Sequence, residues 1–169
     1  MLKVFDQFVP SSVCLACDGC CRFSDAKSSW RPRVGDGEAL PVIADREPIK
    51  SRRLIEPDRY LAMQESGTMF NCICLQSQGN KCRAYATRPF ECQLYPFLIF
   101  RDGEAIVVAA HLNCPFIQER KDEKKFASYV SFLEDFFHRK EILVFLERNR
   151  ALFPEYQTAR DEVLPLFSL

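Results

Sequence analysis

The first 67 residues show no sustained hydrophobic periodicity. Five prolines are spread between residues 10 and 57, and each would interrupt a long helix. We therefore expect an irregular N-terminal half, with a short strand over residues 34–43 and a short helix over residues 49–63.

Residues 68–113 alternate between apolar runs and turn residues, a pattern typical of antiparallel hairpins. The first predicted hairpin pairs residues 69–75 with 81–85 across Ser77-Gln78-Gly79-Asn80. The second pairs residues 94–100 with 105–112 across Asp102-Gly103, which is a strong turn signal.

After Pro115 the apolar positions recur at three- and four-residue spacing, which predicts helices. One apolar face would consist of Phe126, Tyr129, Val130, Leu133, Phe136 and Phe137. Further helices are expected over residues 141–152 and 155–164. The predicted fold class is α+β: a small cysteine-rich domain with two short β-hairpins over residues 1–117, and a C-terminal helical segment over 118–169 packed on it as a single compact unit.

Composition excludes several classes of protein. Hydrophobic residues make up 47 % of the chain, but no stretch approaches the ~20 apolar residues that span a membrane. Lys+Arg and Asp+Glu number 23 each, so the net charge favours no nucleic-acid partner. The first residues carry no secretory signal pattern, and a cytoplasmic location is expected.

Four cysteines lie in the string C-L-A-C-D-G-C-C, which runs from Cys14 to Cys21. A spacing of two residues lets a short loop direct Cys14, Cys17 and Cys20 at one centre. Thiolates are soft ligands that zinc and iron–sulfur clusters both accept. The string therefore predicts a metal site.

Disulfides are the alternative use of these cysteines. The chain has nine cysteines, so one chain cannot pair them all, and in a reducing cytoplasm closely spaced cysteines are more often metal ligands. At 169 residues the chain can also bury a core without cross-links.

The remaining cysteines fall at predicted strand ends and turns. Cys20 and Cys21 are adjacent, and both can be ligands only if the chain bends there or if they serve two centres. The candidate metal ligands are Cys14, Cys17, Cys20, Cys21, Cys74, Cys82, Cys92 and Cys114. We assign Cys72 to the core, because Cys is among the most buried residue types.

These motifs resemble a known family. The signature Cys14-x2-Cys17-x2-Cys20-Cys21 is followed in order by Cys74-Leu75, Cys82-x2-Tyr85, Arg88-Pro89, Cys92, Tyr95-Pro96 and Cys114-Pro115. Over residues 14–117 the chain is similar to the CxxCxxCC family, described as zinc- or iron-chelating and often as iron–sulfur-cluster-containing. It departs from the family pattern at Gln93 and Phe116, and by Asn80-Lys81 between Gly79 and Cys82.

The resemblance implies a limited set of activities. Flagellin lysine N-methylases look similar over the cysteine motif, which implies a redox or protein-modifying role with a protein substrate or redox partner. The spacing is not the C-x3-C-x2-C of radical S-adenosylmethionine enzymes, and no nucleotide-binding motif is present. Arg88 is the candidate residue for binding a cofactor or anionic substrate, and His111 is a weak candidate ligand or proton carrier. No catalytic residue is identified, and whether the protein is an enzyme stays open.

Two classes of function remain. The first is an iron–sulfur protein with a redox or enzymatic role, which is favoured because three thiols at two-residue spacing and a remote Cys-Pro resemble a ferredoxin ligand run. The second is a binding or structural module that zinc stabilises without catalysis. Zinc sites usually show two separated C-x2-C pairs, and here only the first has that form.

Overall fold

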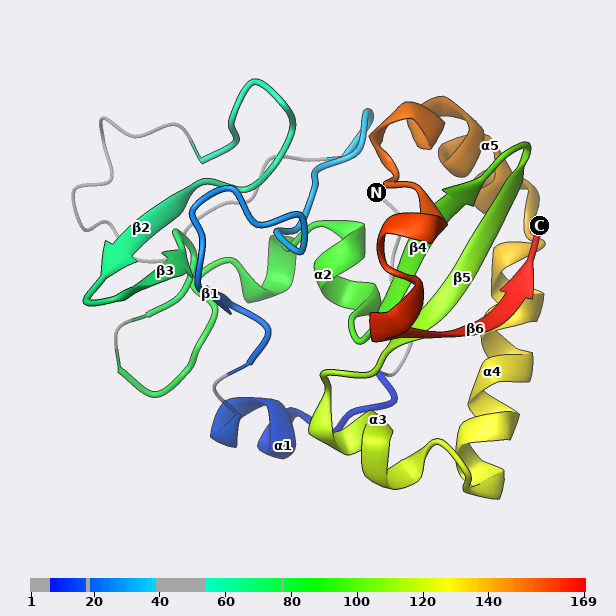
Figure 1. Cartoon of the computed structure of the whole chain (residues 1–169), viewed down its shortest axis with the longest axis horizontal. Coiled ribbons are helices and arrows are strands. Elements are labelled where there is room, and N and C mark those ends of the chain that lie inside the picture. Colours follow the sequence, from blue (N-terminus) through cyan, green and yellow to red (C-terminus); the bar gives the residue numbers. More distant parts are fainter. Residues whose placement is uncertain (1–6, 18, 39–53, 77) are drawn as a thin grey trace. The chain divides into compact units, whose positions relative to one another are not determined.

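The computed structural model describes residues 7–17, 19–38, 54–76 and 78–169, and in it the chain forms two compact units. The first unit comprises residues 10–93. The second comprises residues 94–169 together with residues 7–9. Both contain helices and antiparallel strands, which confirms the predicted α+β class (Figure 1). The division at residue 117 between a cysteine-rich domain and a helical extension stays a prediction.

The first unit is built from short elements joined by long loops. In chain order these are α1 (Ser11–Ala16), β1 (Arg22–Phe23), β2 (Met63–Ser66), β3 (Met69–Cys72), the 3-10 turn η1 (Tyr85–Thr87) and α2 (Phe90–Leu94), whose last residue begins the second unit. The three strands form an antiparallel sheet with β3 in the centre. The irregular character that the prolines predict is therefore present.

The hairpin of the first unit lies earlier in the chain than predicted. β3 pairs with β2 across Gly67-Thr68, and Gly67 takes a φ of 64°, a left-handed conformation that glycine adopts at little cost. The predicted pairing of residues 69–75 with 81–85 reduces to one isolated bridge between Leu75 and Cys82. The prediction missed this turn because Gly67 is followed by threonine rather than by a strong turn partner.

The helix expected over residues 49–63 is wrong where the chain is described. Residues 54–62 fold back on themselves through the bridge Ile55↔Leu61, and Arg59 has a φ of 72°. Pro57 and the positive φ at Arg59 are both incompatible with a continuous helix. Residues 39–53, which include the second half of the strand predicted over residues 34–43, lie outside the described residues, and its described first half at residues 34–38 contains no strand.

Cysteines take part in the core of the first unit. The buried core residues are Val34, Leu61, Ala62, Cys72, Ile73, Cys74 and Ala84, and the half-buried side chains packed on them include Cys21, Cys82 and Cys92. Sulfur is apolar enough to replace methyl groups in such a core. The hydrophobic effect that folds this unit therefore also gathers these five thiols.

The second unit contains the predicted second hairpin. β4 (Phe97–Asp102) pairs with β5 (Ala105–His111), and β5 also pairs with β6 (Val163–Ser168). The helices are α3 (Pro115–Arg120), α4 (Lys124–Phe137) and α5 (Lys140–Asn149), followed by the 3-10 turns η2 (Arg150–Leu152), η3 (Tyr156–Thr158) and η4 (Arg160–Glu162).

Two of the three predicted C-terminal helices are confirmed, and the third is wrong. Residues 155–164 form two 3-10 turns and then enter β6. Pro165 lacks an N–H group, which suits the edge position of β6 and opposes a helix continuing into it.

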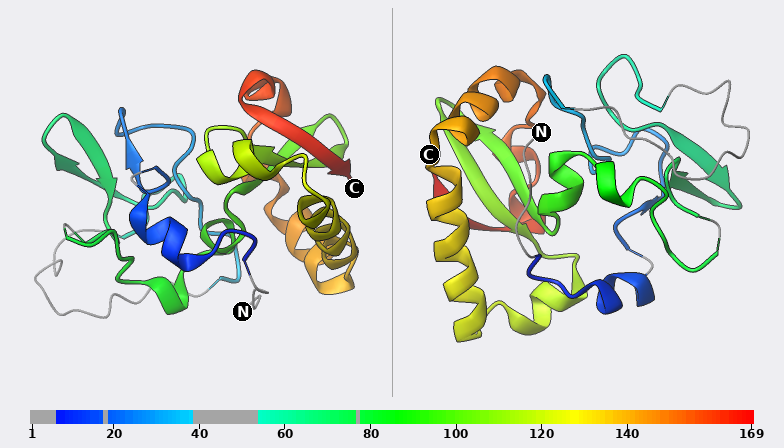
Figure 2. Two further views of the ribbon diagram at one scale, coloured as in Figure 1. Left: turned by 90° about the horizontal axis from the view of Figure 1, so that it is seen from below. Right: turned by 180° about the vertical axis from the view of Figure 1, so that it is seen from behind.

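Aromatic side chains pack α4 against one face of this sheet. Phe97 stacks on Phe126 and Tyr129 at centroid distances of 6.1 and 5.3 Å, and Phe137 contacts Phe167 of β6 at 5.8 Å. Figures 1 and 2 show α4 running alongside the sheet. The aromatic stripe of the sequence is therefore core packing. Over the described residues, no helix is both long and apolar enough to cross a membrane.

Candidate metal centre

The first two cysteines of the motif lie on and just after α1. Cys14 is exposed on this helix, and Cys17 is its half-buried C-terminal cap. A Cβ placed on Gly19 would lie 3.4 Å from the Cys17 sulfur, so the backbone of Gly19 passes close to that thiol. The structure therefore keeps Cys17 beside the turn that carries the next two cysteines.

Cys20 and Cys21 lie in a turn rather than in extended chain. The N–H of Arg22 donates to the carbonyl of Gly19 at 3.2 Å, which bends the backbone between them. The two adjacent thiols are hydrogen-bonded to each other, and this bond raises the pKa of Cys20 above its ordinary value. The bend that the sequence requires for joint use of both thiols is present.

Cys72 and Cys74 form a second pair of contacting thiols at the end of β3. Their thiols are hydrogen-bonded, and the backbone N–H of Cys74 also donates to the Cys72 sulfur. This hydrogen bond between thiols, followed by burial, raises the pKa of Cys72. The N–H of Cys72 donates to the carbonyl of Cys21 at 2.9 Å, so the two pairs lie on neighbouring strands of chain.

Cys82 and Cys92 approach from the next two segments. The N–H of Arg83 donates to the carbonyl of Cys74 at 2.8 Å, which holds the Cys82 turn against the end of β3. The N–H of Ala84 donates to the Cys82 sulfur. Burial raises the pKa of both Cys82 and Cys92, and the charge of Cys72 raises both further. The charge of Cys20 also raises the pKa of Cys82, and the charges of Cys82 and Glu91 raise that of Cys92.

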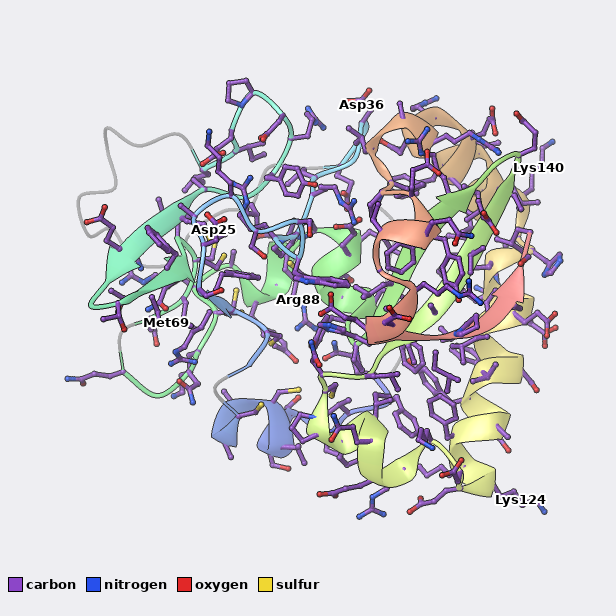
Figure 3. All side chains as sticks on the ribbon, in the orientation of Figure 1. Asp25, Asp36, Met69, Arg88, Lys124 and Lys140 are labelled. Carbon is purple, nitrogen blue, oxygen red and sulfur yellow. The ribbon has the colours of Figure 1, made fainter. Side chains whose placement is uncertain are left out.

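Six cysteines thus share one neighbourhood, which we call the thiol cluster: Cys20, Cys21, Cys72, Cys74, Cys82 and Cys92. Figure 3 shows sulfur atoms gathered beside β3 and the approach to α2. Among the residues described, no three Cys, His, Asp or Glu side chains stand in an arrangement that could hold a metal ion without moving. Metal uptake would require these thiols to exchange hydrogen bonds with one another for metal–sulfur bonds.

Cys72 is the cluster member that sequence reasoning left out. It is 4 % exposed, as expected of a core residue, yet its sulfur contacts Cys74 and lies within electrostatic range of Cys20, Cys82 and Cys92. The spacing Cys72-x-Cys74 was the available signal, because residues two apart on a strand share a face.

Arg88 supplies positive charge to the cluster. Its guanidinium lies 3.9 Å above the Tyr85 ring centroid. Its charge opposes the rise in pKa of Cys20, Cys82 and Cys92, and so favours their thiolate forms. The structure therefore places this residue beside the thiols, while its role in binding a cofactor stays a prediction.

Cys114 and His111 belong to the second unit. Cys114 is buried at the N-terminal cap of α3, where Pro115 begins the helix. His111 is buried at the end of β5, with its Nδ1 3.1 Å from the Tyr95 hydroxyl, and burial lowers its pKa. The assignment of Cys114 as a ligand stays a prediction.

Asn80 connects the N-terminal motif to the turn before Cys82. Its Oδ1 accepts a hydrogen bond from the Arg22 guanidinium, and its Nδ2 donates to the carbonyl of Leu15 at 3.1 Å. The residue has a φ of 53°, a conformation that asparagine tolerates better than most residues. One side chain therefore ties two points around the cysteine motif to the same turn.

The α+β fold and its gathered thiols define a small cysteine-rich protein. The chain belongs to the CxxCxxCC family, which is described as a "Putative zinc- or iron-chelating domain". The family model matches residues 13–128. No curated protein and no solved structure matched the chain.

Replacing Asn80 by glycine should loosen the N-terminal motif without straining the turn. Glycine keeps the positive φ at little cost, while the loss of two hydrogen bonds removes about 1 kcal/mol each. We expect faster alkylation of Cys17 and Cys20 by a thiol reagent, measured by mass spectrometry. The control is Gln78→Ala, an exposed change in the same turn. Equal rates in the two variants would contradict the bridging role.

Proposed function

We propose that this protein holds an iron–sulfur cluster through its thiol cluster. The observation that supports this most is the gathering of five thiols, Cys21, Cys72, Cys74, Cys82 and Cys92, in and against one small core, with the exposed Cys20 hydrogen-bonded to Cys21 beside them. Chance burial of cysteines would not also place Arg88 beside three of them.

The donor set fits a soft metal centre. The thiol cluster offers only sulfur, which zinc and iron–sulfur clusters both accept. Backbone N–H groups already point at the sulfurs of Cys72 and Cys82, and such N–H···S bonds stabilise thiolates and tune cluster potentials. Because the pKa values of Cys20, Cys72, Cys82 and Cys92 are raised, metal must displace their protons, so uptake weakens as pH falls.

Iron is favoured over zinc by the motif itself. The run Cys14-x2-Cys17-x2-Cys20 resembles a ferredoxin ligand run more than a pair of zinc knuckles, and Cys20 is the member of this run that belongs to the thiol cluster. An iron–sulfur cluster, when bound, accepts and releases single electrons. We infer a redox or protein-modifying role, with a protein substrate or redox partner, in a reducing compartment such as the cytoplasm.

Anaerobic purification followed by metal analysis and a visible spectrum tests this proposal. We expect a brown protein that contains iron and acid-labile sulfide. A colourless protein with near-stoichiometric zinc would instead establish the alternative, a zinc-stabilised module. A chain free of both metals would contradict chelation altogether.

Cys72→Ser should lower metal content as strongly as Cys92→Ser, since both thiols belong to the thiol cluster. Serine replaces a soft thiolate by a hard, poorly ionised oxygen, which costs affinity for this kind of centre. Cys72 is thus expected to be a metal ligand as well as a core residue. The matched control is Ile73→Val, which removes a methylene from the same core at a cost of about 1 kcal/mol. If Cys72→Ser retains metal as Ile73→Val does, Cys72 is a core residue and not a metal ligand.

Arg88→Ala should weaken metal retention more than Arg88→Lys does. Lysine keeps the positive charge near the thiolates but loses the planar stacking on Tyr85, whereas alanine loses both. Retention is measured as the rate at which a chelator removes the metal. Identical rates in the two variants would show that the charge of Arg88 does not act on the centre.

A further inference from the structure

We propose that Arg33, acting through Glu91, is a positioning residue that sets the place of Cys92 in the thiol cluster. This inference rests on the proposed function, and it concerns residues outside the cysteine motifs. All the residues involved belong to the first unit.

Arg33 and Glu91 form a buried, two-pronged ion pair. The Arg33 Nη2 lies 2.7 Å from Glu91 Oε1, and the Arg33 Nε donates to Oε2 at 3.1 Å. The backbone N–H of Arg33 donates to the same Oε2 at 2.8 Å. The side chains are only 7 % and 14 % exposed, so water screens this pair little.

The pair acts on a helix that cannot hold its own position. α2 has five residues, far fewer than an isolated helix needs for stability. Cys92 follows Glu91 directly on this helix. A fixed Glu91 carboxylate therefore determines where the next residue directs its thiol.

A second carboxylate from the same segment as Arg33 holds the start of α2. Glu38 accepts a hydrogen bond from the N–H of Phe90, the first residue of the helix, at 2.6 Å. Its other oxygen accepts from the N–H of Gly35, also at 2.6 Å. Residues 33–38 thus bind the first two residues of α2: Glu38 binds Phe90, and Arg33 binds Glu91.

The segment that carries Arg33 and Glu38 is itself fixed in the core of the first unit. Val34, between Arg33 and Gly35, is fully buried in the core that also contains Cys72 and Cys74. Its N–H donates to the carbonyl of Arg59 at 2.9 Å. The Arg33–Glu91 pair therefore fixes the position of α2, and with it Cys92, relative to the core that contains Cys72 and Cys74.

Arg31 provides a matched control two residues earlier. It is 3 % exposed and pairs with Glu56 at 2.9 Å, and its guanidinium lies 4.5 Å above the Tyr60 ring. Arg33 lies 5.7 Å from the same ring. The two arginines share burial, ion pairing and an aromatic neighbour, but Glu56 lies outside the helix that carries Cys92.

The test compares Arg33→Lys with Arg31→Lys in the full chain, purified anaerobically with its metal. Lysine keeps the charge but cannot form the two-pronged pair. We expect EDTA to remove metal from Arg33→Lys about tenfold faster than from the wild type, as for other residues that orient metal ligands. Arg31→Lys should stay within about twofold, since its partners do not hold a ligand.

Alkylation of the metal-loaded protein supplies a readout that general destabilisation does not move. Cys92 alone should react faster in Arg33→Lys, whereas Cys72 and Cys74 should react as in the wild type. If Arg33→Lys fails to fold, Glu91→Gln removes the same pair from the other side and should give the same pattern.

Two outcomes separate this inference from the proposed function. If the wild type holds metal and Arg33→Lys behaves as Arg31→Lys, the positioning role is overturned and the proposed function stands. If the wild type takes up no metal, or Cys92→Ser keeps metal as the wild type does, the proposed role of Cys92 falls and the inference falls with it.

Discussion

Hydrogen bonds between irregular stretches of backbone hold the cysteines of the first unit together. The N–H of Cys72 meets the carbonyl of Cys21, and the N–H of Arg83 meets the carbonyl of Cys74. Neither bond belongs to a helix or to a pairing between named strands. Buried backbone groups must be paired, so a loop-rich core is possible only where such bonds replace regular structure. The position of every cluster thiol except Cys92, which a helix carries, depends on this arrangement.

The second unit is held together by different interactions. Its sheet pairs the central strand β5 on both sides, and aromatic rings from β4, β6 and α4 pack together on one face of that sheet. Phe8, from the N-terminal stretch, adds edge contacts to Phe97, Phe116 and Phe126. Hydrophobic burial and regular hydrogen bonding are the main interactions of this unit.

Sequence reasoning succeeded where one signal dominated. The turn at Asp102-Gly103 and the aromatic spacing of α4 were enough to place the second hairpin and the longest helix. It failed where distant partners decide the outcome. β6 exists because β5 offers a free edge, and residues 54–62 turn because segment 33–35 pairs with them. Five of the eight candidate ligands lie in the thiol cluster, whereas Cys14, Cys17 and Cys114 lie outside it, and the ligand assignment stays a prediction. Cys72 was assigned to the core because burial was given more weight than the face it shares with Cys74.

A thiol differs from other apolar side chains because it can lose a proton and become an anion. The core of the first unit therefore has no single polarity. With the thiols protonated, it is an apolar core in which sulfur packs beside valine, leucine and isoleucine. With the protons removed, the same atoms would form a concentrated negative charge that only a cation can stabilise. The same side chains thus pack as apolar groups when protonated and would attract a cation when deprotonated.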